Sequence, residues 1–167
     1  MADLITTRLV LHPLGIEEAR RLVAGTPQVD DRWEEGYPTD GDVTGARKFL
    51  DICARVGDPQ PFGPYEVRRG DNGRAIGGLG FHGRPNAIGT VTIGYGLIPS
   101  AQGKGYASEA LRGLVAAARD WGVTGVEGDA DLDNIASRRV MEAVGMRCVA
   151  EDGRCAYYRI DWTDGAG

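Results

Sequence analysis

The chain has 167 residues, of which 42% are hydrophobic and 26% are charged, and its formal net charge is −5 at pH 7. This length suits one domain with a sizeable core, so we interpret residues 1–167 as a single domain whose tail is frayed from about residue 163. The modest negative charge argues against a surface that binds nucleic acid or an anionic membrane. No apolar run is long enough to span a bilayer and the N-terminus lacks a signal-peptide core, so we expect a cytoplasmic protein.

The three cysteines suggest neither a metal site nor a disulfide framework. Cys53, Cys148 and Cys155 fit no zinc-ligand spacing, and an odd count leaves one of them without a partner. We interpret them as small packing residues, and we expect no metal.

The first half of the chain predicts an opening strand, two helices separated by a loop, and two further strands. In order, the pattern predicts a strand over 8–14, a helix over 16–24, a loop over 25–42 rich in Gly, Pro and Asp, a helix from its cap Thr44 to about Val56, and strands over 65–69 and 75–81. Prolines at 59, 61 and 64 end the second helix, because the residue before a proline is pushed out of the helical conformation.

The second half alternates strands and helices. It predicts a strand over 90–98, a helix over 106–121, a strand over about 124–130, a helix over 134–144 and a hairpin of 146–151 with 155–162. Apolar residues recur along one face of 106–121 at the helical period, and Gly122 ends that helix. This alternation predicts one α/β domain around a mixed sheet.

A glycine-rich turn, Gln102-Gly103-Lys104-Gly105-Tyr106-Ala107, joins the strand over 90–98 to the following helix. Such a turn offers unpaired backbone N–H groups and the positive end of the helix dipole to an anion, an arrangement that fits a pyrophosphate. A P-loop would need a glycine at Ile98 and a hydroxyl after Lys104, and a dinucleotide fingerprint would need a glycine at Ser108. The sequence therefore argues against both motifs at this turn. A literal G-x-G-x-x-G over 78–83 is followed by turn residues and another strand, and we interpret that match as chance.

The spacing of Gln102, Gly105 and Ala107 resembles the coenzyme A pyrophosphate loop of the GNAT superfamily of acyl-CoA-dependent N-acetyltransferases. Residues 133–146 resemble the family's second helix, in which an asparagine opens the helix and a glycine followed by a large apolar residue closes it. Residues 7–14 resemble the first strand of the ribosomal-protein-alanine N-acetyltransferase (Rim-type) branch. Together these segments cover nearly the whole chain.

The resemblance implies a GNAT-type α/β domain, with about six or seven strands in a mixed, mostly antiparallel sheet that is splayed near its middle and flanked by about four helices. It also implies that the protein moves an acetyl group from acetyl-CoA to a primary amine, either a protein N-terminal α-amine or a small molecule, by direct attack through a tetrahedral intermediate. The alternative is a catalytically silent acyl-CoA-binding module of the same fold. The branch suggests a monomer or a homodimer.

The resemblance places acetyl-CoA along the end of the strand and the loop. It implies that backbone N–H groups of Gln102, Gly103, Lys104, Gly105, Tyr106 and Ala107 face the pyrophosphate, and that backbone groups of Leu97 and Ile98 pair with the pantetheine arm. Ser108 either adds a hydroxyl or simply begins the helix, and the Lys104 side chain either pairs with a phosphate or is solvated. Asn134 either hydrogen-bonds the pantetheine or caps its helix.

The leaving thiolate needs a proton, and the incoming amine must lose one. Many members of the family protonate the thiolate with a tyrosine where this chain has Met141, which cannot do so. Ser137, one helical turn after Asn134, is therefore our candidate acid, although its hydroxyl could instead bond back to the helix.

Alternation along the strand over 124–130 puts Glu127, Asp129 and Asp131 on one face. Glu127 matches a glutamate common in the branch, and it is our first candidate for the base. Asp129 or a relaying water is the alternative, and these carboxylates could also form an ordinary solvated face.

We expect the acceptor amine to contact the loop over 25–42, Tyr95 and His82. Trp33 lies among acidic residues and could form a cage for a cation, or it could pin a solvated acidic loop. Tyr95 lies in a segment close to the strand signature of the branch, which usually has a glutamate at Thr92 and a bulky aromatic residue at Gly96. His82 is a single histidine in a turn and could equally be a surface residue.

Overall fold

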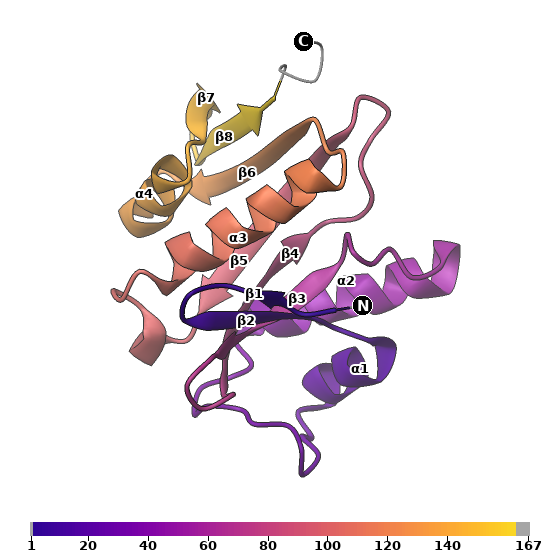
Figure 1. Cartoon of the computed structure of the whole chain (residues 1–167). Helices are drawn as coiled ribbons and strands as arrows, with labels where there is room; N and C mark the ends of the chain where they lie inside the picture. Colours follow the sequence, from indigo (N-terminus) through magenta and orange to yellow (C-terminus); the bar gives the residue numbers. More distant parts are fainter. Residues whose placement is uncertain (1, 163–167) are drawn as a thin grey trace.

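The computed structural model describes residues 2–162, so the tail expected to be frayed lies outside the described residues. Eight strands form one sheet in the order β1-β2-β3-β4-β5-β6-β8-β7 (Figure 1). Their bounds are β1 Leu4–Ile5, β2 Leu9–Pro13, β3 Pro64–Arg69, β4 Ala75–Phe81, β5 Thr90–Leu97, β6 Gly125–Asp131, β7 Arg147–Glu151 and β8 Cys155–Asp161. Only β5 and β6 pair in parallel, which confirms a mixed and mostly antiparallel sheet and adds the short β1 to the strands expected from the sequence.

The helices cover both faces of this sheet. They are α1 Ile16–Ala24, α2 Asp40–Val56, α3 Tyr106–Asp120 and α4 Ile135–Ala143, with a 3₁₀ turn over Pro99–Ala101 before α3. In Figure 1, α3 and α4 lie on one face and α1 and α2 on the other. The face of α3 predicted to be apolar is buried, which confirms the periodicity read from the sequence. Within residues 2–162, no helix is long and apolar enough to cross a membrane.

Helix α2 begins earlier than the sequence suggested. Its N-cap is Thr39, whose hydroxyl oxygen accepts the Asp42 N–H at 3.2 Å, while the Asp42 carboxylate accepts the Thr39 N–H at 2.9 Å. The prediction that Thr44 caps this helix is therefore wrong, because Thr44 lies inside it. The reciprocal cap outweighs the low helix propensity of Gly41 and Gly45, which made this segment resemble a loop.

The sheet opens near its middle, between β5 and β6. These strands pair at Thr90 with Gly125, at Val91 with Val126 and at Thr92 with Glu127. Beyond that point β5 stays on β4 as far as Leu97, while β6 follows β8. This confirms the expected splay. Beyond the third pair, the backbone edges of β5 and β6 that face each other no longer pair with each other.

An ion pair joins the start of β2 to the start of α3. Glu109 accepts hydrogen bonds from Arg8 Nε at 2.7 Å, from the Arg8 N–H at 2.7 Å and from the Thr6 hydroxyl at 2.5 Å. Burial alone would raise the pKa of Glu109, but these hydrogen bonds outweigh it and lower the pKa. Arg8 also donates to the carbonyl oxygen of Lys104 at 2.9 Å and lies over the Tyr106 ring, so it holds the glycine-rich loop against the sheet.

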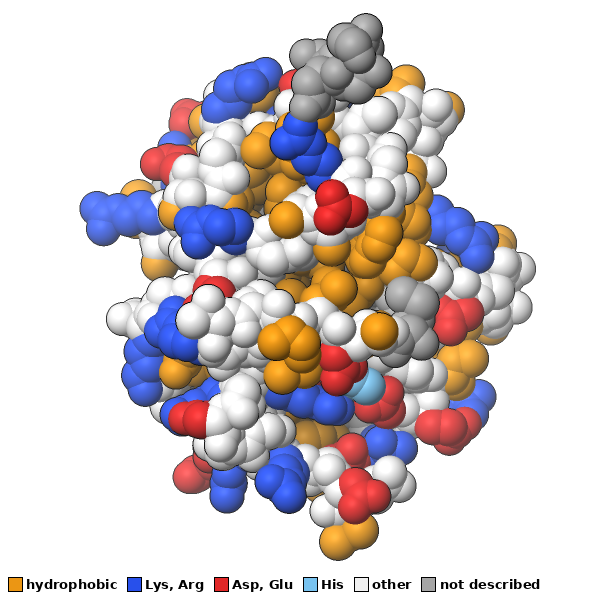
Figure 2. Space-filling view, in the orientation of Figure 1, with side chains coloured by type: hydrophobic (Ala, Val, Ile, Leu, Met, Phe, Trp, Pro, Cys, Tyr) orange, Lys and Arg blue, Asp and Glu red, His pale blue; other side chains and the backbone are white. Residues whose placement is uncertain are grey.

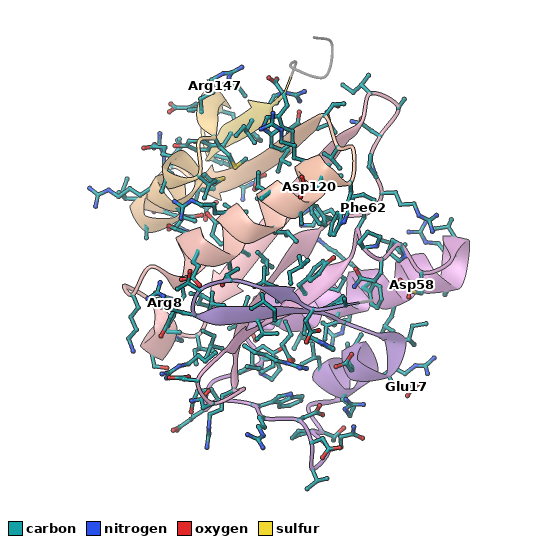
Figure 3. All side chains as sticks on the ribbon, viewed as in Figure 1. Arg8, Glu17, Asp58, Phe62, Asp120 and Arg147 are labelled. Atoms are coloured by element: carbon teal, nitrogen blue, oxygen red, sulfur yellow. The ribbon has the colours of Figure 1, made fainter. Side chains whose placement is uncertain are left out.

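Charged side chains of both signs are interspersed over the face of the molecule shown in Figure 2. Figure 3 places Arg8 beside the loop that leads into α3, whereas Glu17 projects from α1, well away from that loop. Glu17 also pairs with an arginine, Arg20, but both side chains of that pair are mostly exposed, at 75% and 62%. The two ion pairs therefore differ in burial.

We expect Glu109→Gln to lower the free energy of unfolding by about 1–3 kcal/mol, because it weakens charge-assisted bonds to Arg8 and Thr6. The matched control Glu17→Gln should change it by less than about 0.5 kcal/mol, as is usual for an exposed pair. Urea titration measures both. An equal decrease in the free energy of unfolding of both variants would show that the Arg8–Glu109 pair stabilises the fold no more than the exposed Glu17–Arg20 pair.

Candidate active site

The glycine-rich loop has the backbone conformation expected of an anion site. Gly103 and Gly105 have φ values of 77° and 81°, in the left-handed region that favours glycine. Gly105 is the N-cap of α3, and no side chain caps this helix. The first N–H groups of α3 therefore remain available to a ligand.

Side chains around the loop brace it or line a hollow beside it. Gln102 donates through Nε2 to the Leu97 carbonyl at 3.1 Å, which ties the loop to the end of β5. Lys104 and Tyr106 border a hollow of about 580 Å³ that Arg69 also lines. Ala107 and Ser108 follow in the first turn of α3 and are partly buried.

The backbone at the end of β5 is only partly available for a cofactor arm. The Ile98 N–H donates to the Ile76 carbonyl at 2.9 Å, so the expectation that Ile98 offers this donor to the pantetheine arm is wrong. Hydrogen-bonded and non-bonded pairs alternate along antiparallel strands, and Leu97 faces Gly77 at the next pair. The backbone of Leu97 therefore points away from β4, toward the opening.

Two hydroxyl groups meet beside this opening, on the face covered by α3 and α4. The Tyr95 Oη lies 2.8 Å from the Ser137 Oγ and donates to the Ser137 carbonyl oxygen at 2.9 Å. Burial raises the pKa of Tyr95, although the Ser137 hydrogen bond partly offsets it, so this phenol is protonated at neutral pH. Tyr95, which we predicted to contact the acceptor, is therefore hydrogen-bonded to the candidate acid Ser137.

Asn134 forms the cap that the sequence left as one alternative. Its Oδ1 accepts the Ser137 N–H at 3.1 Å, and the residue itself is exposed. Met141 is fully buried, and its sulfur lies 3.2 Å from where a methyl group on Gly128 would be. Met141 is therefore part of the core.

The carboxylates of β6 lie on the opposite face, as their alternation predicted. Glu127 forms an ion pair with Arg159, which also pairs with Asp161 at 3.0 Å. Asp129 lies one step further along the same face, beyond the last pair that β6 makes with β5. Among residues 2–162, the Asp129 side chain has no hydrogen-bond or ion-pair partner, although its backbone pairs with Tyr157 of β8.

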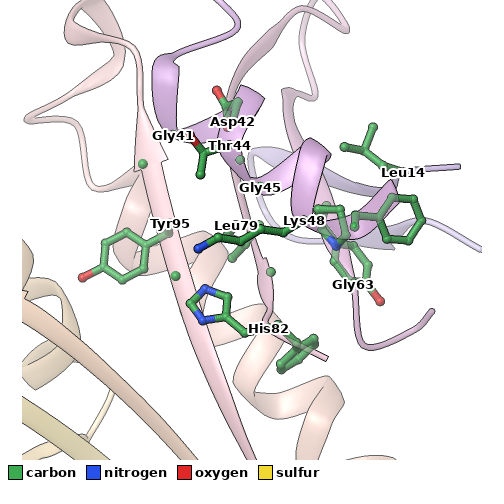
Figure 4. A pocket seen from close by; sticks show the side chains of 18 of the residues that line it. Leu14, Gly41, Asp42, Thr44, Gly45, Lys48, Gly63, Leu79, His82 and Tyr95 are labelled. Carbon is green, nitrogen blue, oxygen red and sulfur yellow. The ribbon is translucent and has the colours of Figure 1, made fainter. Parts of the chain in front are cut away.

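A cavity of about 380 Å³ lies between α2 and strands β4 and β5, on the face that carries Asp129 (Figure 4). Its lining includes apolar side chains of α1, α2 and the segment before β3, namely Leu22, Phe49, Ile52 and Phe62. Lys48, His82 and Tyr95 lie at its opening toward β6. A mostly apolar cavity with a few polar groups at one end is typical of a small-molecule site.

Glycines form the floor of this cavity. Gly78 faces Gly96, and Gly80 faces Gly94, in two cross-strand pairs of β4 and β5. All four lie on the face of the sheet toward α2. A methyl group placed on Gly78 would lie 2.3 Å from Oδ1 of Asp42, and one placed on Gly80 would lie 2.6 Å from the carbonyl oxygen of Gly63. Among the described residues, nothing lies within 4 Å of such a group on Gly96, so this position leaves open space.

Lys48 is the residue that sequence reasoning missed, and it lines this cavity together with His82, which the sequence suggested as an acceptor contact. A methyl group placed on Gly94 would lie 3.0 Å from Nε2 of His82, so the imidazole covers β5 just where β6 departs. Burial and the charge of Lys48 lower the pKa of His82, and the charge of Asp129 opposes them, so His82 is neutral at pH 7. No local sequence pattern indicates that Lys48, His82 and Asp129 lie near one another, because they come from α2, from the end of β4 and from β6.

Trp33 does not line the cavity. It bridges to Ala75 at the far end of β4 and packs edge-on against Tyr37, with 5.8 Å between ring centroids. Neighbouring acidic residues are paired elsewhere, Asp31 with Arg21 at 2.6 Å and Glu34 with Arg74 at 3.6 Å. The loop therefore supports the sheet at this point, and two of the acidic residues near Trp33 are engaged by arginines.

Comparisons with known proteins agree with this geometry. The family described as "Acetyltransferase (GNAT) domain" matches residues 8–147. An uncharacterized N-acetyltransferase of Bacillus subtilis, YjdG, is 28% identical over 120 residues, which are 67% of this chain and 71% of that protein. The chain belongs to the GNAT acetyltransferase family, and it is an acetyl-CoA-dependent acetyltransferase.

Solved structures share the fold. RimL, a ribosomal-protein α-N-acetyltransferase in complex with coenzyme A, has a TM-score of 0.69 and 17% identity, over 96% of this chain and 98% of that one. The microcin C7 self-immunity acetyltransferase MccE, in complex with acetyl-CoA and AMP, has a TM-score of 0.64 and 15% identity, over 93% of both chains.

We expect Gly105→Ala to weaken acetyl-CoA binding at least about tenfold, because the loop must leave its left-handed conformation or carry about 1–2 kcal/mol of strain. Gly25→Ala is the matched control, since Gly25 has a φ of 68° and caps the remote end of α1. Calorimetric titration with acetyl-CoA measures both. Weakened binding in Gly25→Ala, or unchanged binding in Gly105→Ala, would contradict a pyrophosphate site at this loop.

Proposed function

We propose that this GNAT acetyltransferase transfers the acetyl group of acetyl-CoA directly to a primary amine that is bound in the cavity under α2. The opening between β5 and β6 carries this proposal. Side chains from both faces of the sheet reach it, Tyr95 and Ser137 from one face and His82 and Asp129 from the other. Donor and acceptor can therefore approach from opposite faces and meet there.

On the donor side, the loop from Gln102 to Ala107 and the start of α3 hold the pyrophosphate through backbone N–H groups. The left-handed glycines and the uncapped helix are the features that fit this ligand. Leu97 and Asn134 lie along the path from the loop to the hydroxyl pair, and they bind the pantetheine arm. The thioester supplies the electrophilic carbonyl carbon.

On the acceptor side, His82 removes the proton from the amine. Its imidazole is neutral, borders the cavity and covers β5 beside the opening. The Asp129 carboxylate stabilises the imidazolium that forms, as its effect on the His82 pKa indicates. Glu127 is less suited to this role, because the Arg159 guanidinium neutralises it.

The transfer needs one bond to form and one to break. The amine nitrogen attacks the carbonyl carbon, the carbon–sulfur bond breaks, and the thiolate takes a proton from the hydroxyl pair of Tyr95 and Ser137. The proton lost by the amine goes to His82. Roughly one α-amine in ten is already neutral at pH 7, so a weak base suffices for such an acceptor. Every residue in this scheme comes from one chain, so a monomer can carry it out.

We expect Ser137→Ala and Tyr95→Phe each to lower kcat about a hundredfold, because each removes a hydroxyl from the pair that protonates the thiolate. The double variant should lose little more than either single one, since both act through one hydrogen bond. Tyr157→Phe removes an exposed phenol bonded to Asp152 and serves as the control. Thiol release from acetyl-CoA gives kcat, and calorimetry should show acetyl-CoA binding unchanged. Normal turnover in both single variants would exclude this pair.

The pH dependence tests His82. A base must be deprotonated, so kcat/KM should fall as pH drops through the His82 pKa, which lies below its ordinary value of 6.5. His82→Gln should remove this acid limb and lower kcat/KM at pH 7.5 by about a hundredfold or more. Glu127→Gln is the matched control and should keep the limb. Because protonation of the acceptor amine also lowers kcat/KM at acid pH, kcat/KM is calculated on the concentration of neutral amine. An acid limb that then persists in His82→Gln would show that His82 is not the base.

A further inference from the structure

We propose that the acceptor is a compact amine that carries an apolar substituent and an acid group close to the amine, of which an apolar α-amino acid is the simplest example. This inference rests on the proposed function, because it assigns the amine to the same cavity. It comes from the apolar depth of the cavity, the open position at Gly96 and an unpaired ammonium group at the mouth.

The apolar substituent fits the depth of the cavity. Phe49, Ile52 and Phe62 line it below α2, and Leu22 lines it from α1. The sheet side has backbone alone at Gly78, Gly80, Gly94 and Gly96. A volume of about 380 Å³ is at the small end of ligand sites, and it suits one side chain of the acceptor better than a long peptide.

Gly96 keeps the entrance open. Asp42 covers Gly78, and His82 covers Gly94, but a methyl group placed on Gly96 would meet nothing within 4 Å. The φ of Gly96 is not positive, so the backbone there accepts any residue. An aromatic side chain at this position would close the entrance without straining the strand.

Lys48 selects an acid group. Its side chain projects from α2 toward Tyr95 and His82 at the mouth (Figure 4). With the residues that the structure describes, Lys48 makes no ion pair and no hydrogen bond. Its charge is close enough to lower the pKa of His82, and an ammonium group in a partly enclosed site favours an anionic partner.

The three parts are arranged in the order that such a molecule needs. The amine lies between His82 and Asp129 at the opening, the carboxylate lies on Lys48 at the mouth, and the apolar group enters beneath α2. The Oδ2 of Asp42 is bound to the cap residue Thr39, and its Oδ1 lies over Gly78 in the cavity. A peptide N-terminus has an amide in place of this carboxylate, so Lys48 distinguishes it from a free amino acid.

Thiol release from acetyl-CoA by the full chain tests the inference with matched acceptors. The panel is L-phenylalanine, L-phenylalaninamide, phenethylamine, L-alanine, a peptide beginning with phenylalanine, and a polyamine. We expect kcat/KM for phenylalanine to exceed that for each other acceptor at least about tenfold. Phenylalanine should also raise the Tm of the coenzyme A complex more than alanine does.

Two variants separate the carboxylate from the apolar group. Lys48→Met should remove the preference for phenylalanine over phenylalaninamide, whereas Arg47→Met, on the same helix but outside the cavity, should keep it. Gly96→Phe should lower kcat/KM for phenylalanine at least about tenfold, and by a larger factor than it lowers kcat/KM for alanine. Gly153→Phe, at another open glycine, is the control for folding, with Tm measured for every variant.

The outcomes distinguish this inference from the proposed function. Faster turnover of the peptide, the polyamine or phenethylamine would overturn the inference and keep the proposed function. Equal effects of Lys48→Met on phenylalanine and its amide would also overturn it. Acetyl-CoA binding without acceptor-dependent thiol release from any amine in the panel would overturn both.

Discussion

The parting of β5 from β6 is the constraint on which the rest of the structure depends. The strands share three register pairs, at Thr90, Val91 and Thr92, and then follow different neighbours. Backbone groups that a continuous sheet would pair with each other are thereby directed toward an opening. The opening also connects the two faces of the sheet, so side chains that a closed sheet would keep apart can act on one bond.

The charged side chains near this opening differ in whether they have a partner of opposite charge. Arg159 neutralises Glu127 where β5 and β6 still pair, while Asp129, one step beyond, is left without an ion partner among the residues that the structure describes. Burial, with a smaller effect of the Lys48 charge, lowers the His82 pKa against the opposing charge of Asp129, so the imidazole is neutral at pH 7. On the donor face, the hydroxyl pair of Tyr95 and Ser137 is uncharged and protonated. The proposed proton acceptor, His82, and the proposed proton donors, Tyr95 and Ser137, thus lie on opposite faces of the sheet.

Glycine has two distinct uses in this chain. At Gly103 and Gly105 it permits a left-handed backbone, so that N–H groups face a ligand. In β4 and β5 it has ordinary strand conformations, and what matters is the missing side chain, because protein interiors are otherwise filled. The first use shapes the proposed donor site, and the second leaves room for the proposed acceptor. Arg8 links these regions mechanically, since it joins the edge of the sheet to the loop and to Glu109.

The sequence by itself determined the features whose causes are local. The glycine-rich turn before an amphipathic helix, the alternation of Glu127 and Asp129, and the helix that Asn134 opens all follow from spacing between near neighbours, and the structure shows each of them. Tertiary structure decided the rest. Strand register placed the Ile98 N–H on Ile76 and turned Leu97 toward the opening, and reciprocal hydrogen bonds moved the start of α2 to Thr39. The meeting of Lys48, His82 and Asp129 joins segments far apart in the chain, and no local pattern specifies it, because it depends on how helix α2 packs across a sheet that opens.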